Sequence, residues 1–151
     1  MTQDPNALLQ RLYAEQQMLE SNIQVMQESI QLVQSSLNSY RTGLEVLEEI
    51  EKREEDEVML INIGGAVFVE AKLVNIDKVT RGIGSGVRIE QSLGEAKKHI
   101  NDRVEMLEKR LSELRDDYED TLVRAQAINN QMQQLAAQAQ MQQQQPQQQE
   151  E

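Results

Sequence analysis

Three closely spaced glycines could take part in chemistry, because glycine-rich loops can bind phosphate groups. Gly82, Gly84 and Gly86 occupy alternate positions. A phosphate loop needs either the G-x-G-x-x-G spacing or the longer pattern that ends in Gly-Lys followed by Ser or Thr, at the start of a helix. The three glycines match neither pattern. We therefore interpret them as part of a turn between β-strands.

The other chemically active side chains are one histidine and many carboxylates. His99 is the only histidine and the chain has no cysteine, which excludes a metal cluster of these residues, a disulfide framework and thiolate chemistry. We expect His99 to be a solvated surface residue near the start of a helix. The 26 Asp and Glu residues are expected on exposed helix faces. The sequence therefore predicts no enzyme, no cofactor and no metal site.

The composition excludes several classes of partner. The net charge is -11, whereas nucleic-acid binding needs a basic patch. No apolar run approaches the roughly 20 residues of a membrane span, and no basic segment followed by an apolar one suggests a signal peptide. We expect a cytoplasmic protein without a membrane partner. Aromatic residues make up only 3% of the chain, which favours long helices over a broad globular core.

Both ends of the chain carry the seven-residue apolar repeat of a coiled coil. Over residues 9–47, apolar or aromatic side chains alternate in steps of three and four, and Gln16 is the one exception. The same pattern occupies residues 100–139, where Thr121 is the exception. The two repeats therefore predict two long amphipathic helices.

The helix starts and the register between the helices can also be predicted. Asp4 is a suitable N-cap before Pro5, and Ser92 with Glu95 has the spacing of a capping box. The two repeats are nearly equal in length. If the middle of the chain folds back, the start of one repeat meets the end of the other in a single antiparallel register.

The middle of the chain changes to the two-residue period of β-strands. Gly64-Gly65 and Gly84-Ser85-Gly86 are strong turn signals, and each lies between two apolar stretches. We therefore predict two consecutive β-hairpins. The expected strands are residues 58–63, 67–73, 79–83 and 87–90.

These elements give a mainly α-helical fold with a small β segment, divided into four parts. The last part is rich in glutamine and has too little apolar content to offset the entropy of ordering, so we expect it to be disordered. The expected parts are an N-terminal coiled-coil helix (4–56), two β-hairpins (57–91), a C-terminal coiled-coil helix (92–139) and the glutamine-rich tail (140–151).

The two hairpins are not expected to be stable without a partner. A single hairpin is marginal in water, and unpaired strand edges with apolar faces recruit other strands. A closed β-barrel made from the hairpins of several chains would remove these edges. We therefore expect an oligomer that assembles through its hairpins. The candidate assembly residues are Val58, Leu60, Ile61, Ile63, Val67, Phe68, Val69, Leu73, Val79, Ile83, Val87 and Ile89.

With these elements the chain resembles prefoldin, a chaperone of archaea and eukaryotes. The resemblance covers nearly the whole chain as helix, two hairpins and helix. It is most specific in residues 61–69 (INIGGAVFV) and 82–87 (GIGSGV), where alpha-type subunits carry apolar strands and glycine turns. The family often has proline where Asn62 stands here, which is a mild departure. Beta-type subunits are expected to have one hairpin, so two hairpins point to the alpha type.

The resemblance implies an assembly and an activity. Two alpha-type and four beta-type subunits are expected to form a heterohexamer whose hairpins build a double β-barrel, with six coiled coils projecting from it. The tips of the coiled coils are expected to hold unfolded polypeptide clients and to pass them to a group II chaperonin. We expect capture to proceed without ATP, through weak apolar contacts shared by several arms.

Two long stretches of the predicted helices are almost free of charge. Glu28 is the only charged residue between Ser21 and Tyr40, and there is none between Ala125 and Gln149. We expect these stretches to lie together in the distal half of the coiled coil, where they would form an adaptable apolar surface. The candidate client-binding residues are Leu8, Leu9, Leu12, Tyr13, Met18, Leu19, Met132, Leu135 and Met141.

Two alternatives remain open at the level of the sequence. Five of the candidates, Leu9, Leu12, Leu19, Met132 and Leu135, lie on the apolar repeat and can simply pack against each other, whereas the remaining four lie off it. The whole chain could also be a passive coiled-coil tether or scaffold subunit. A tether, however, needs neither uncharged tips nor two hairpins.

Overall fold

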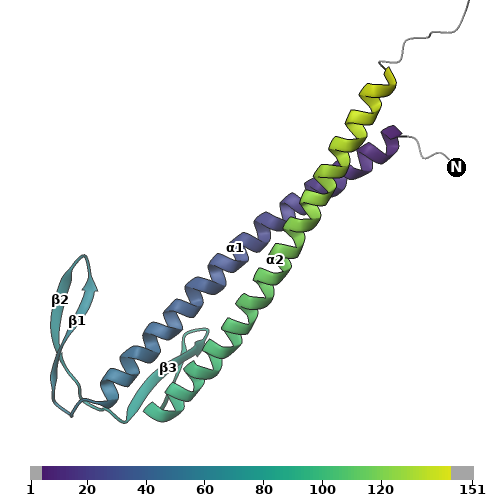
Figure 1. Ribbon diagram of the computed structural model, residues 1–151. Coiled ribbons are helices and arrows are strands. Elements are labelled where there is room, and N and C mark those ends of the chain that lie inside the picture. The colour runs from purple at the N-terminus through teal and green to yellow at the C-terminus, as the bar shows by residue number, and fades with distance from the viewer. Residues whose placement is uncertain (1–4, 144–151) are drawn as a thin grey trace, which may run out of the picture. The chain divides into compact units, whose positions relative to one another are not determined.

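The computed structural model describes residues 5–143, and it contains two long helices with four strands between them in the chain (Figure 1). The chain divides into two compact units. The first contains residues up to Leu32 and from Leu111 onwards, and the second contains the residues between them. The elements are α1 (Pro5–Glu51), β1 (Val58–Gly64), β2 (Val67–Lys72), β3 (Lys78–Gly84), β4 (Val87–Ser92) and α2 (Leu93–Gln143).

The C-terminal ends of both helices differ from the expected ones. α1 ends at Glu51, before the expected position 56. α2 continues through residues 140–143, which belong to the expected disordered tail. Position 4 and the rest of the expected tail, 144–151, lie outside the described residues. The glutamines at the end of α2 are good helix formers, which accounts for the extension.

The start of α2 has the predicted capping box. The Ser92 hydroxyl accepts a hydrogen bond from the backbone N–H of Glu95 at 3.1 Å. The Glu95 carboxylate accepts one from the backbone N–H of Ser92 at 3.2 Å. Both bonds satisfy amide groups that the first turn of a helix leaves without partners, so the predicted start of this helix is confirmed.

In the first unit, α1 and α2 are joined by a buried apolar cluster. Leu12 and Leu19 of α1 pack with Ile128 and Met132 of α2, and all four side chains are less than 10% exposed. All four belong to the predicted apolar repeats. The antiparallel pairing of the helices is therefore confirmed within this unit.

In the second unit, the helices also meet along their repeats. Leu37 of α1 is the most buried large side chain described, at 1% exposure. Two ion pairs lie further along α1: Arg41 binds Glu108, and Lys97 binds Glu51 at 2.6 Å. Both pairs join α1 to α2 in the same antiparallel sense.

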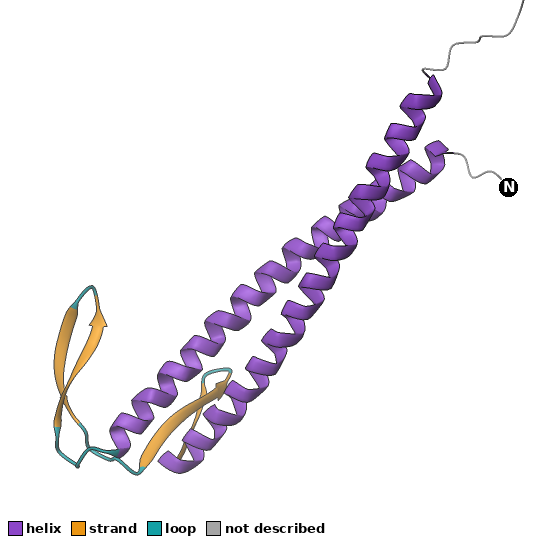
Figure 2. Cartoon of the chain, viewed as in Figure 1, coloured by secondary structure: helices purple, strands orange, loops and turns teal. Residues whose placement is uncertain are grey.

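The four strands of the second unit form two separate two-stranded antiparallel sheets (Figure 2). β1 pairs with β2 so that Ile61 lies opposite Val69, and β3 pairs with β4 so that Arg81 lies opposite Ile89. Each hairpin has a register shift just before its turn. The turns at Gly64–Ala66 and Gly84–Gly86 contain only positive φ angles, between 51° and 110°, which explains the glycines there. The prediction of two hairpins is confirmed.

Among the described residues, no helix is long and apolar enough to cross a membrane. In the same part of the chain, no three acidic or histidine side chains gather where they could hold a metal ion.

Candidate functional site

The candidate client-binding residues divide into buried and exposed groups in the first unit. Three of them, Leu12, Leu19 and Met132, are core residues with exposures of 5%, 5% and 7%. Leu8, Leu9 and Leu135 are half-buried against this core. Leu8 was expected to lie off the packed seam, and the structure corrects this, because its side chain packs on the cluster.

The exposed group contains the remaining three candidates. Tyr13 is 53% exposed, Met18 is 61% exposed and Met141 is 70% exposed. Each is a large apolar or aromatic side chain in water, next to helices whose seam is already filled. The structure therefore leaves Tyr13, Met18 and Met141 available to a partner, while the core residues hold the two helices together.

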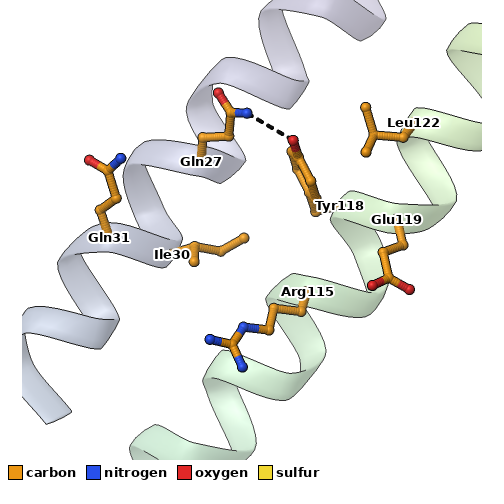
Figure 3. A pocket seen from close by; sticks show the side chains of 7 residues that line it. All are labelled: Gln27, Ile30, Gln31, Arg115, Tyr118, Glu119 and Leu122. Carbon is orange, nitrogen blue, oxygen red and sulfur yellow. Dashed lines mark hydrogen bonds between the residues drawn. The ribbon is translucent and has the colours of Figure 1, made fainter.

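The two uncharged stretches do not lie together as expected. In the first unit, the Gln27 amide donates a hydrogen bond to the Tyr118 hydroxyl at 2.8 Å (Figure 3). The uncharged part of α1 therefore faces the charged part of α2, and Gln31 shares a groove with Arg115 and Glu119. The uncharged end of α2 instead pairs with the first turns of α1, where Ile128 and Met132 meet Leu12 and Leu19. The expectation was wrong because the antiparallel register offsets the two stretches.

This part of the first unit contains a groove of about 600 Å³ between the helices (Figure 3). Ile30, Leu122 and the ring of Tyr118 supply its apolar surface, and Gln27, Gln31, Arg115 and Glu119 supply polar groups. The apolar repeats of the sequence do not predict this groove. The signal for it was a weak seam, because bulky Tyr118 is followed three residues later by the polar Thr121, whose hydroxyl bonds the Asp117 carbonyl at 2.7 Å.

Nearly all of the candidate assembly residues are exposed to solvent. Exposure ranges from 36% for Ile89 to 66% for Leu60, and only Leu73 and Val79 are half-buried. On the first hairpin, Met59, Ile61, Val67, Val69 and Ala71 share one face, because neighbours across the ladder point the same way and alternate residues of a strand share a face. Ile63 lies at the register shift. The opposite face alternates apolar residues with Glu70 and Lys72. One face of this hairpin is therefore wholly apolar, and its residues Ile61, Val67 and Val69 are exposed.

A second groove, of about 470 Å³, lies between the end of α1 and strand β1 in the second unit. Val46 and Ile50 of α1 line it together with Met59, Leu60 and Ile61 of β1, and Glu45, Glu49 and Arg53 lie at its polar side. Val46, Ile50 and Met59 are not among the candidate residues expected from the sequence. Val46 is 50% exposed and lies off the seam, which was the available signal.

Charged groups hold the junction between α1 and the first hairpin. The Glu57 carboxylate accepts hydrogen bonds from the Glu54 backbone N–H at 3.2 Å and from the Arg53 guanidinium at 2.6 Å. These bonds, the backbone one first, lower the pKa of Glu57 below its usual 4.5. The Asp56 N–H donates to the Leu73 carbonyl at 2.8 Å, which closes the base of the hairpin.

Residues near the start of α2 contact both the end of α1 and strand β3. The Glu51 carboxylate beside Lys97 raises the pKa of that amine above 10.5. His99 was expected to be solvated, but its ring is half-buried, and Nε2 lies 3.3 Å from the Arg81 guanidinium on β3. Arg81 also donates to the Gln91 amide oxygen at 3.2 Å. His99 therefore belongs to the contact between hairpin and helix.

Comparison with known proteins gives a consistent result at the level of sequence. A family model described as "Prefoldin subunit" matches residues 19–147. Prefoldin subunit alpha of Archaeoglobus fulgidus is 35% identical over 103 residues, which are 68% of this chain and 73% of that protein. Prefoldin subunit alpha of Methanopyrus kandleri is 38% identical over 105 residues, which are 70% of this chain and 67% of that protein.

Solved structures of low sequence identity share the fold. The cryo-EM structure of filamentous PFD from Methanocaldococcus jannaschii has a TM-score of 0.63 at 20% identity, over 76% of this chain and 95% of that one. The crystal structure of the prefoldin beta subunit from Thermococcus strain KS-1 has a TM-score of 0.55 at 17% identity, over 84% of this chain and 90% of that one. With two long helices, two hairpins and alpha-subunit relatives, the chain belongs to the prefoldin family of chaperone subunits and is similar to its archaeal alpha-type members.

Proposed function

We propose that this chain is the alpha-type subunit of a cytoplasmic, ATP-independent chaperone that captures unfolded polypeptides near the free ends of its two helices. The observation that carries the proposal is the exposure of Tyr13, Met18 and Met141 beside a helix pair whose seam is already filled. Methionine is flexible and polarisable, which suits contacts with many different apolar segments. The unfolded client is then passed to a group II chaperonin.

The assembly that we propose contains two of these chains and four beta-type subunits, joined through the hairpins. The wholly apolar face of the first hairpin supports this step, because such a face is stable only when another surface covers it. Continuous β-pairing between chains would form a closed double barrel without free edges. The solved structure of a prefoldin beta subunit offers a partner of the same fold.

An aggregation assay with a chemically denatured substrate tests the proposed activity. The complex with a beta-type subunit should suppress light scattering without nucleotide. A variant with Tyr13→Ser, Met18→Ser and Met141→Ser should lose most of this protection while its helical content is unchanged, because all three side chains are exposed. Val123→Ser, at a position that is 66% exposed on α2, is the matched control. Full protection by the triple variant would instead favour a passive tether role for this chain.

A further inference from the structure

α1 carries a second apolar row that its pairing with α2 does not use. Met18, Val25 and Leu32 are 61%, 59% and 70% exposed. They are spaced seven residues apart, which is close to two helical turns, so they lie in one row with neighbours roughly 10 Å apart. They follow the seam positions Gln16, Ile23 and Ile30 by two residues, on the solvent side of a two-stranded coiled coil, where polar residues are the rule.

The surroundings of this row carry almost no charge. Glu28 is the only charged residue in positions 21–32, and Glu15 is the charged residue one turn before Met18. The helix neighbours of Val25 include Ser21, Asn22 and Ser29, which are short and uncharged. The Ser29 hydroxyl donates to the Val25 carbonyl at 2.8 Å, so it is already satisfied within the helix. An apolar segment can therefore approach the row while only two charged helix neighbours, Glu15 and Glu28, would lose water.

These properties decide which kind of partner the row can hold. Three side chains provide far less than the roughly 800 Å² per partner that a stable interface buries, so the row alone cannot hold a second folded copy. A specific helical partner would also need a pattern of charges beside the row to set its register, and the row has only Glu15 and Glu28 beside it. What remains is a weak contact of low selectivity that continues from Met18 along the helix.

We propose that Met18, Val25 and Leu32 form a lateral track on α1 for unfolded polypeptide with widely spaced apolar residues. This inference rests on the proposed chaperone function and extends it from the helix ends along the outer face of α1. The track binds either an amphipathic segment or an extended chain, because each anchor is a separate apolar contact. Each contact of the track is weak, and the client stays bound only while several contacts hold at once. The client can therefore be released.

Binding of a permanently unfolded probe tests the track. Fluorescently labelled, reduced and carboxymethylated lactalbumin is titrated with the complex of this chain and a beta-type subunit. The double variant Val25→Ser with Leu32→Ser should raise the Kd roughly tenfold, since two apolar contacts are lost. Val123→Ser on α2 should leave the Kd unchanged. An unchanged Kd for the double variant overturns the track.

Three further readouts separate the possible failures. If the wild-type complex does not bind the probe, the proposed function itself fails. If only the track proposal is wrong, the wild-type complex still binds the probe, and substitutions of Tyr13 and Met141 still weaken that binding. A photoreactive benzoylphenylalanine in place of Val25 should crosslink to the probe, and one in place of Val123 should not. If sedimentation shows self-association that the double variant abolishes without a change in Kd, the row is an interface between copies and the proposal is wrong.

Discussion

At the scale of single residues, Glu57 is a group whose ionisation the fold changes. Its carboxylate accepts one backbone and one guanidinium hydrogen bond at the end of α1. Both bonds favour the ionised form, so the pKa is lower in the folded chain than in the unfolded one. The stabilisation is therefore present above the usual value of 4.5 and is lost as the pH falls through the folded pKa.

The prediction for this residue is a carboxyl titration below that of a free glutamate. NMR titration of the full chain should show a Glu57 pKa under 4.5. Arg53→Gln should raise this pKa only in part, because the Glu54 N–H is the larger cause and remains. Complete return to the ordinary value in the variant would assign the effect to the ion pair alone. The stability change should be small, since exposed ion pairs contribute little.

At the scale of elements, the capping box of α2 has a measurable role. Ser92→Ala removes the hydroxyl that accepts the Glu95 N–H and should destabilise the chain by about 1 kcal/mol. Urea unfolding followed by circular dichroism measures this change. Ser112→Ala, at an exposed position inside α2, is the matched control and should be neutral or slightly stabilising. Equal effects of the two substitutions would contradict a capping role for Ser92.

The elements themselves could be predicted from local patterns, but side-chain surroundings could not. The seven-residue repeats and the turn at Gly64-Gly65 specify helix and hairpin through spacing alone, because each period matches one backbone geometry. The outcome for Leu8 depended on how the end of the helix pair packs. The position of Gln27 beside Tyr118 depended on the register between helices, which brings charged and uncharged stretches opposite each other.

The candidate site was predictable to a similar degree. Exposure of Tyr13, Met18 and Met141 followed from their positions off the repeat, and burial of Leu12 and Leu19 followed from positions on it. The seven-residue spacing of Val25 and Leu32 is also visible in the sequence. It could be recognised only once the structure showed that neither residue is covered. A periodic apolar row is ambiguous between core and surface until its partner helix is placed.

At the scale of the whole molecule, the hairpins and the apolar helix surfaces have separate roles that can be tested independently. If client affinity comes from several chains acting together, breaking the assembly should weaken binding even when every helix is intact. Ile61 and Val69 are opposite one another on the wholly apolar face of the first hairpin and are 44% and 41% exposed. Charges there prevent that face from being buried, because a charged group loses its hydration on burial.

The double variant Ile61→Lys with Val69→Lys should therefore remain monomeric in native mass spectrometry when mixed with a beta-type subunit. Its affinity for an unfolded probe should fall by about a hundredfold or more, since avidity across linked sites commonly adds that much. Glu70→Lys, on the mixed face of the same hairpin, adds positive charge without touching the apolar face and should still assemble. Circular dichroism should show unchanged helix content in both variants. A monomeric variant that binds the probe as tightly as the complex does would mean that one helix pair holds a client without help, and the multivalent account of capture would have to be abandoned.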